Sequence, residues 1–417
     1  MTTKLPPPPL AFTNARLVLP DALRPGSLLV RDGAIAAMGT IDIPGDVEVI
    51  DLDGLMLAPA IVDLGVFSVD VAACHAGGIV RIGLMPDQSP VLDDPGIVQR
   101  SALIGRPRLW IHPIAAATRG LAGTDLAEMA INAQAGARAV GTGRRWISDA
   151  GVMRKVLAYA RDLDQAVIAH AEDGGLVGAA VATEGETATR LGLASAPALA
   201  EALAIARDLM LAEETGARVH FRQVTTAAGF DLIRAAKRRG VAVTCGVTPA
   251  HLLLSDIAMT DFRTFAHLSP ALRAESDRQA TLAALRDGTI DVLSSGHDPR
   301  GPEEKRLPFA DSMPGMSGAE TLLPLALGLV RDSYLPIDRL FQLLAANPSR
   351  ILGLDGGKLV EGAPADLLAF DPDAPWQIVA DRMIARAGNT PFDGLPVQSR
   401  VRHLVKGGIR LELPPLR

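Results

Sequence analysis

The side chains best suited to chemistry are a few histidines and carboxylates that follow apolar, strand-like runs. They lie in the segments His170-Ala-Glu-Asp173, His220-Phe-Arg-Gln223 and Ser295-Gly-His-Asp-Pro299. Imidazoles and carboxylates can hold zinc, which polarises a carbonyl group and makes a bound water nucleophilic near neutral pH. Such a site needs about three protein ligands. Alone at the end of a strand, His170 is therefore better interpreted as a packed or hydrogen-bonded residue.

Two alternatives keep chemistry in these segments. His220, His251 and His297 would supply the imidazoles of a repurposed mononuclear metal site. Asp298 would supply a general base, although strand alternation should aim its side chain elsewhere unless the loop has already begun. Both alternatives stay open at the level of sequence.

The elements that must position these residues change in character twice along the chain. Residues 10–57 form short apolar runs separated by Asp32-Gly33 and Asp53-Gly54, which are typical of tight hairpins. From residue 57 to about 354, strand-like runs alternate with amphipathic helices such as 198–215 and 227–239. This alternation favours a (β/α)8 barrel, with an open doubly wound sheet as the alternative. Strand patterns return after Lys358.

We therefore predict an α/β protein with two domains. Residues 57–357 form the favoured TIM-like (β/α)8 barrel, and residues 1–56 and 358–417 together form a small β domain built from both chain termini.

Composition excludes several functional classes. The 417 residues contain 41 Lys and Arg against 47 Asp and Glu, so no basic excess favours nucleic acid. The two cysteines, Cys74 and Cys245, provide neither a disulfide framework nor a thiolate zinc site, which fits a reduced compartment. No stretch has the form of a signal peptide or the roughly 18 apolar residues of a membrane span. We expect a soluble cytoplasmic protein without membrane contact.

Several segments, in order, carry a resemblance to a known family. They include Leu57-Ala-Pro-Ala-Ile-Val-Asp63, His170-Ala-Glu-Asp173, Thr248-Pro-Ala-His251 and Asn389-Thr-Pro-Phe392. Their order and spacing resemble the dihydroorotase branch of the amidohydrolase superfamily over almost the whole chain. The resemblance implies a barrel with a β-sandwich from both termini. It also implies reversible hydrolysis of a cyclic amide by zinc-activated water.

The resemblance also assigns positions to the metal site, the base and the substrate. Most of these positions hold residues that are unfit for the task. The metal-site positions are Gly65, Phe67, Thr142, His170, Gln223 and Gly296, of which only His170 keeps a usual ligand. Gly296 also stands where the general base is expected. The positions that would read the substrate hold Val69, Asp87 and Ser269. This pattern predicts no catalytic residue, no substrate-binding residue and no metal.

The metal, base and substrate positions are lost, whereas framework segments such as Asn389-Thr-Pro-Phe392 remain recognisable. This combination predicts a catalytically inactive homologue, a pseudo-dihydroorotase. By resemblance, such a chain belongs to pyrimidine biosynthesis and forms an oligomeric complex with the catalytic subunit of aspartate carbamoyltransferase. Arg144-Arg-Trp146 is a candidate interface segment, because arginine and tryptophan are enriched at protein interfaces. The alternatives are a zinc-dependent cyclic amidohydrolase with an altered site and a barrel that binds a small molecule.

Overall fold

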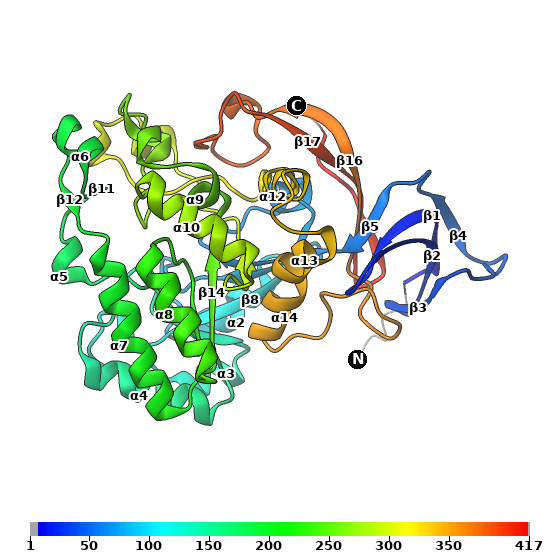
Figure 1. Cartoon of the computed structure of the whole chain (residues 1–417). Coiled ribbons are helices and arrows are strands. Elements are labelled where there is room, and N and C mark those ends of the chain that lie inside the picture. Colours follow the sequence, from blue (N-terminus) through cyan, green and yellow to red (C-terminus); the bar gives the residue numbers. More distant parts are fainter. Residues whose placement is uncertain (1–6, 416–417) are drawn as a thin grey trace.

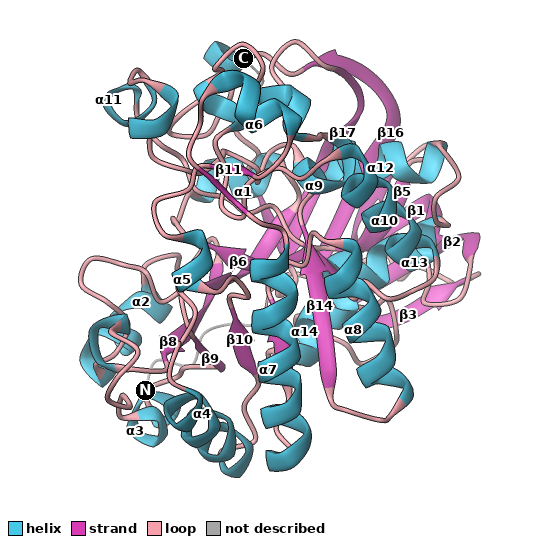
Figure 2. Cartoon of the chain, turned by 60° about the vertical axis from the view of Figure 1, so that its left-hand side comes forward, coloured by secondary structure: helices cyan, strands magenta, loops and turns pink. Residues whose placement is uncertain are grey.

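Eight parallel strands form a nearly closed barrel in the computed structural model, which describes residues 7–415 (Figure 2). β15 lies beside β6, and the backbone amide of Ser295 donates to buried Asp63 at 2.9 Å across this seam. The barrel interior is filled by apolar side chains, including Val62, Ile114 and Ile168. The strands are β6 (Ile61–Val66), β7 (Ile79–Leu84), β8 (Trp110–Ala116), β9 (Ala139–Gly141), β10 (Val167–Ala169), β13 (Val219–Phe221), β14 (Val243–Val247) and β15 (Val292–Leu293).

Helices surround the barrel, and their ends follow from local sequence. Asp149 caps α4 by accepting from the Val152 amide, and Thr226 caps α8 by accepting from the Gly229 amide. The helices are α1 (Val71–Ala76), α2 (Pro95–Leu103), α3 (Met129–Gln134), α4 (Ala150–Asp162), α5 (Gly174–Val177), α6 (Glu186–Leu191), α7 (Leu199–Thr215), α8 (Ala227–Arg238), α9 (Pro249–Leu253), α10 (Glu275–Arg286), α11 (Pro302–Lys305), α12 (Leu322–Arg331), α13 (Ile337–Phe341) and α14 (Asn347–Ile351). The predicted helices at 198–215 and 227–239 are confirmed as α7 and α8.

Both ends of the chain contribute to a second, mixed sheet of eight strands (Figure 1). Its order is β18-β17-β16-β5-β1-β2-β3, with β4 paired to β1. The strands are β1 (Leu10–Val18), β2 (Leu23–Arg31), β3 (Ala34–Gly39), β4 (Glu48–Asp51), β5 (Met56–Pro59), β16 (Leu367–Gln377), β17 (Pro396–Lys406) and β18 (Ile409–Leu411). A small two-stranded sheet, β11 (Ala182–Thr183) with β12 (Ser195–Ala196), completes the strands.

The long hairpin of β16 and β17 reaches back over the barrel at α12 (Figure 1). At its base, Asp366 pairs with Arg81 of β7 at 2.6 Å, and both side chains are largely buried. The hairpin thus joins the mixed sheet to the barrel. Within residues 7–415, no helix is long and apolar enough to cross a membrane.

Candidate functional site

The mouth of the barrel, at the carboxyl ends of its strands, holds the positions that the sequence assigns to chemistry. Gly65 and Phe67 stand at the end of β6, Thr142 follows β9, His170 follows β10, Gln223 follows β13 and Gly296 follows β15. The Thr142 hydroxyl accepts from the backbone amide of His170 at 2.9 Å. In parallel barrels such strand ends carry the reacting groups.

One arginine lies among four of these positions. Arg222 is only 4% exposed and donates to Gln223 Oε1 at 2.6 Å. Its guanidinium lies 3.3 Å from His170 Nδ1 and 5.0 Å from the centre of the Phe67 ring. A Cβ atom added to Gly65 would lie 3.6 Å from the Arg222 side chain. A guanidinium therefore fills the space between positions that the resemblance assigns to metal ligands.

A second arginine closes the mouth above Phe67. The Arg144 guanidinium lies 3.7 Å from the centre of the Phe67 ring and 2.7 Å from Asp298 Oδ2. Arg300 shares the same carboxylate oxygen at 3.0 Å. The cavity left between Phe67, Arg222 and Asp298 has a volume of about 20 Å³. That is room for about one water molecule.

The retained histidine belongs to a buried ionic network. His170 Nε2 lies 3.3 Å from Glu172, and Arg273 pairs with Glu172 at 2.8 Å and with Glu201 at 3.4 Å. Burial opposes ionisation of Glu172, but the hydrogen bond from His170 and the charge of Arg273 lower its pKa to about 2. Both ring nitrogens of His170 therefore face protein groups.

The other histidines of the mouth point to separate partners. His220 Nδ1 pairs with the Thr244 hydroxyl at 2.9 Å. His251 bonds to Thr248 and to the Pro270 carbonyl, each at 3.0 Å, and His297 Nδ1 accepts from a backbone amide at 3.3 Å. Burial lowers the pKa of His220 to about 3 and the pKa values of His251 and His297 to about 4.

This arrangement corrects the alternative of a repurposed mononuclear site. In the described part of the chain, no group of three or more His, Cys, Asp or Glu side chains is placed to hold a metal ion. The reason is that His220 lies within β13, His251 on α9 and His297 in the loop after β15, and each bonds to a different partner.

Asp298 and the Arg144 segment lie differently from the sequence-based expectation. β15 ends at Leu293, so strand alternation no longer applies at Asp298, and its carboxylate faces the mouth. Two guanidinium groups share that carboxylate, which makes it a counter-ion. Arg144 is part of the mouth and not a free surface residue, whereas Arg145 is exposed.

The substrate-reading positions do not form a common surface. Val69 packs against the hydrophobic core of the barrel, and Ser269 lines the rim of the mouth. Asp87 accepts from the Arg144 amide at 2.9 Å through Oδ1, and its buried Oδ2 has no partner among the described residues. A carboxylate at this place repels an anionic substrate.

Zinc, which the resemblance implies for active relatives, does not fit the residues present. Of the six metal-site positions, one offers an imidazole and two are glycines. The fixed positive charges of Arg222 and Arg144 occupy the same space, and a guanidinium cannot donate a lone pair to a metal ion. No catalytic step through zinc follows from this donor set.

The fold is that of the barrel amidohydrolases, as comparisons with known proteins show. L-hydantoinase from Arthrobacter aurescens superposes with a TM-score of 0.86 at 23% identity, covering 98% of this chain and 97% of that structure. A dihydroorotase of Pelobacter propionicus is 39% identical over 382 residues, which is 88% of this chain and 90% of that protein. A dihydroorotase-like protein of Pseudomonas aeruginosa is 34% identical over 418 residues, with 96% and 98% covered.

The family model described as dihydro-orotase-like matches residues 57–228. The chain belongs to the dihydroorotase-like family.

Proposed function

We propose that this chain is a catalytically inactive dihydroorotase homologue that supports aspartate carbamoyltransferase in pyrimidine biosynthesis. The observation that carries the first half is the position of Arg222. Its guanidinium hydrogen-bonds to Gln223 and His170 and lies 5.0 Å from the centre of the Phe67 ring, and its methylene groups lie beside Gly65. These are the positions where an active relative would need metal ligands.

The expected reaction needs groups that the mouth does not offer. Hydrolysis of a cyclic amide requires an activated water, a polarised carbonyl and a group that moves protons. Gly296 stands at the base position, and Asp298 is held by Arg144 and Arg300. The remaining cavity of about 20 Å³ does not admit a ring substrate. These features support inactivity.

The partner follows from the family together with the retained scaffold. The barrel and the framework segment Asn389-Thr-Pro-Phe392 persist without the chemistry, which is the expected outcome when the fold itself is used. Noncatalytic dihydroorotase-like chains in some bacteria form complexes with aspartate carbamoyltransferase. A noncatalytic chain changes an enzyme by binding one of its states preferentially.

Mixing the two purified proteins tests this proposal. With the aspartate carbamoyltransferase of the same organism, we expect a stable larger complex by size exclusion with light scattering, and a transferase with higher stability or activity. Separate elution at micromolar concentration and physiological salt, with unchanged transferase kinetics, would refute the partnership.

Arg145 is the first interface variant to make. Its side chain is exposed, so Arg145→Glu should weaken the complex without unfolding the chain, and Arg100→Glu on α2 is the matched exposed control. Arg144 is unsuitable for this purpose, because a carboxylate there would face Asp298 inside the mouth.

A small-molecule role for the mouth has less support. A ligand larger than water would have to displace Arg144 from both Phe67 and Asp298. No observation at the mouth favours it over the noncatalytic role.

A further inference from the structure

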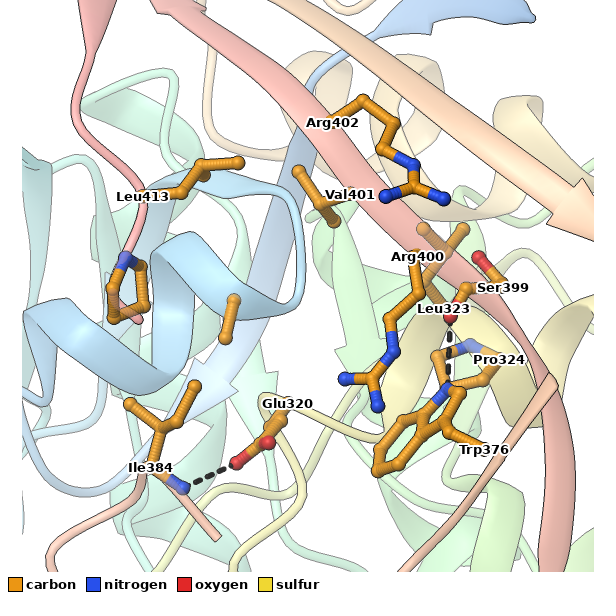
Figure 3. Close-up of a pocket in the computed structure, with 12 residues that line it drawn as sticks. Glu320, Leu323, Pro324, Trp376, Ile384, Ser399, Arg400, Val401, Arg402 and Leu413 are labelled. Atoms are coloured by element: carbon orange, nitrogen blue, oxygen red, sulfur yellow. Dashed lines mark hydrogen bonds between the residues drawn. The ribbon is translucent and has the colours of Figure 1, made fainter. Parts of the chain in front are cut away.

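A larger cavity lies away from the mouth, where the β16–β17 hairpin crosses α12 (Figure 3). Its volume is about 200 Å³, and a neighbouring chamber of about 200 Å³ shares Glu320, Trp376, Ile384 and Arg400 with it. The first cavity alone has about ten times the volume of the mouth cavity. Pockets that bind small molecules are concave and mainly apolar, with few charged groups.

Arg400 is one of three charged residues that line this cavity, with Glu320 and Arg402. Its guanidinium lies 4.2 Å from the centre of the Trp376 ring, and Figure 3 shows it between Trp376 and Glu320. Among the described residues, the Arg400 guanidinium makes no hydrogen bond and no ion pair. Partial burial lowers the pKa of Arg400, and the charge of the nearby Glu320 carboxylate opposes this shift.

The adjacent backbone is strained where it forms the cavity wall. Ser399 has φ of +137°, which is unusual for a residue with a side chain, and the pairing of β16 with β17 shifts register nearby. The Trp376 indole stabilises this backbone conformation by donating a hydrogen bond to the Ser399 carbonyl at 2.9 Å. As a result, four consecutive residues, 399–402, line the cavity, whereas a regular strand would present every second one. Strain of this kind concentrates at ligand clamps.

The opposite wall is apolar. Leu413 and Ile384 face Arg400 across the cavity in Figure 3, and Ala76 also lines the cavity. The wall is fixed because Glu320 Oε2 accepts from the Ile384 amide at 2.8 Å. The cavity therefore offers the Arg400 guanidinium, with the Glu320 carboxylate beside it, at one side and apolar surface at the other.

We propose that this cavity binds a small molecule with an oxyanion head and an apolar body. The head, a carboxylate or a phosphate, pairs with the Arg400 guanidinium, whose planar donors match both groups. The body packs against Ile384 and Leu413. Neither the barrel mouth nor a partner enzyme takes part, so the proposal stands apart from the function proposed above.

Direct binding to the full chain tests the proposal with matched probes. The probes are 4-phenylbutyrate, its uncharged analogue 4-phenylbutyramide, phenyl phosphate and inorganic phosphate, followed by thermal shift and by tryptophan fluorescence, to which Trp376 contributes. We expect at least one charged aromatic probe to bind with Kd below about 1 mM, and the amide to bind at least about tenfold more weakly. Preference between the carboxylate and the phosphate identifies the head group.

Three variants locate the site. Arg400→Gln should weaken the charged probe about tenfold, whereas Arg410→Gln, an exposed arginine of β18 that does not line the cavity, should leave binding unchanged. Ala76→Leu keeps the cation but fills the cavity, and should also abolish binding. Equal binding of acid and amide, unchanged binding in Arg400→Gln and Ala76→Leu, or no binding of any probe at about 10 mM would overturn the proposal.

Discussion

Replacing Arg222 with methionine should make the protein more stable, which is the reverse of the usual effect of a core substitution. Arg222 is 4% exposed and hydrogen-bonds to Gln223 Oε1 and His170 Nδ1, and among the described residues it forms no ion pair. Its Nε has no partner among the described residues. A buried charge without a carboxylate is costly, and apolar replacement of such groups is often stabilising.

The size of the effect follows from the ionisation of Arg222. Burial, with the charge of Arg144 next in size, lowers the pKa of Arg222 from 12.5 to about 10. That change corresponds to about 3 kcal/mol of unfavourable free energy for the charged form. Loss of the hydrogen bond to Gln223 costs about 1 kcal/mol. The free energy of unfolding should therefore rise by about 1–2 kcal/mol in Arg222→Met.

Arg273 provides the matched control, because it has the same 4% exposure but pairs with Glu172 and Glu201. Arg273→Met leaves two carboxylates buried and should lower the free energy of unfolding by about 3–5 kcal/mol. Urea unfolding followed by circular dichroism measures both variants. A loss above about 2 kcal/mol in Arg222→Met, with the same sign as the control, would refute this account of the mouth.

Three further predictions concern the mouth and its rim. The double variant Gly65→His, Phe67→His should not hydrolyse dihydroorotate, and substantial turnover would contradict this. It should also lose stability, because residue 65 has φ of +116° and a Cβ atom there would contact Arg222. Arg144→Ala should lower the free energy of unfolding, measured in urea, by about 1–2 kcal/mol, because the ion pair with Asp298 and the contact with the Phe67 ring are lost. The variant should not gain hydrolytic activity. An unchanged free energy of unfolding would show that Arg144 does not stabilise the mouth. Burial lowers the pKa of Lys305 from 10.5 to about 8, so above pH 8 the folded chain binds fewer protons than the unfolded chain. Between about pH 7.5 and 9.5, the free energy of unfolding of the wild type should therefore rise by about 2 kcal/mol relative to that of the Lys305→Gln variant. A difference between the two proteins that stays constant with pH in urea unfolding would refute this.

The barrel could be predicted from sequence because its signal is local and repeated. The segments that became α7 and α8 carry apolar residues at helical spacing, and the apolar runs between helices became parallel strands. The ordered family segments fixed which strand ends meet. In the structure, Gly65, His170 and Gln223 lie around the Arg222 side chain.

The contents of the mouth could not be predicted in the same way. The sequence suggested Arg144 as an interface residue and left Arg222 unassigned, although both point at Phe67. They leave different loops, so their meeting depends on side-chain directions across the barrel that periodicity does not encode. One signal was available: Arg222 directly follows a short strand inside the segment where a second metal ligand was expected. A charged residue at such a strand end points to the mouth.

The central claim is that this chain keeps the dihydroorotase scaffold without its chemistry. Its most direct test is the hydrolysis of dihydroorotate by untagged protein, measured together with bound zinc before and after chelation. The account predicts no turnover above the uncatalysed rate and no zinc retained in proportion to protein. Near-stoichiometric zinc whose removal abolishes a measurable hydrolysis would contradict it.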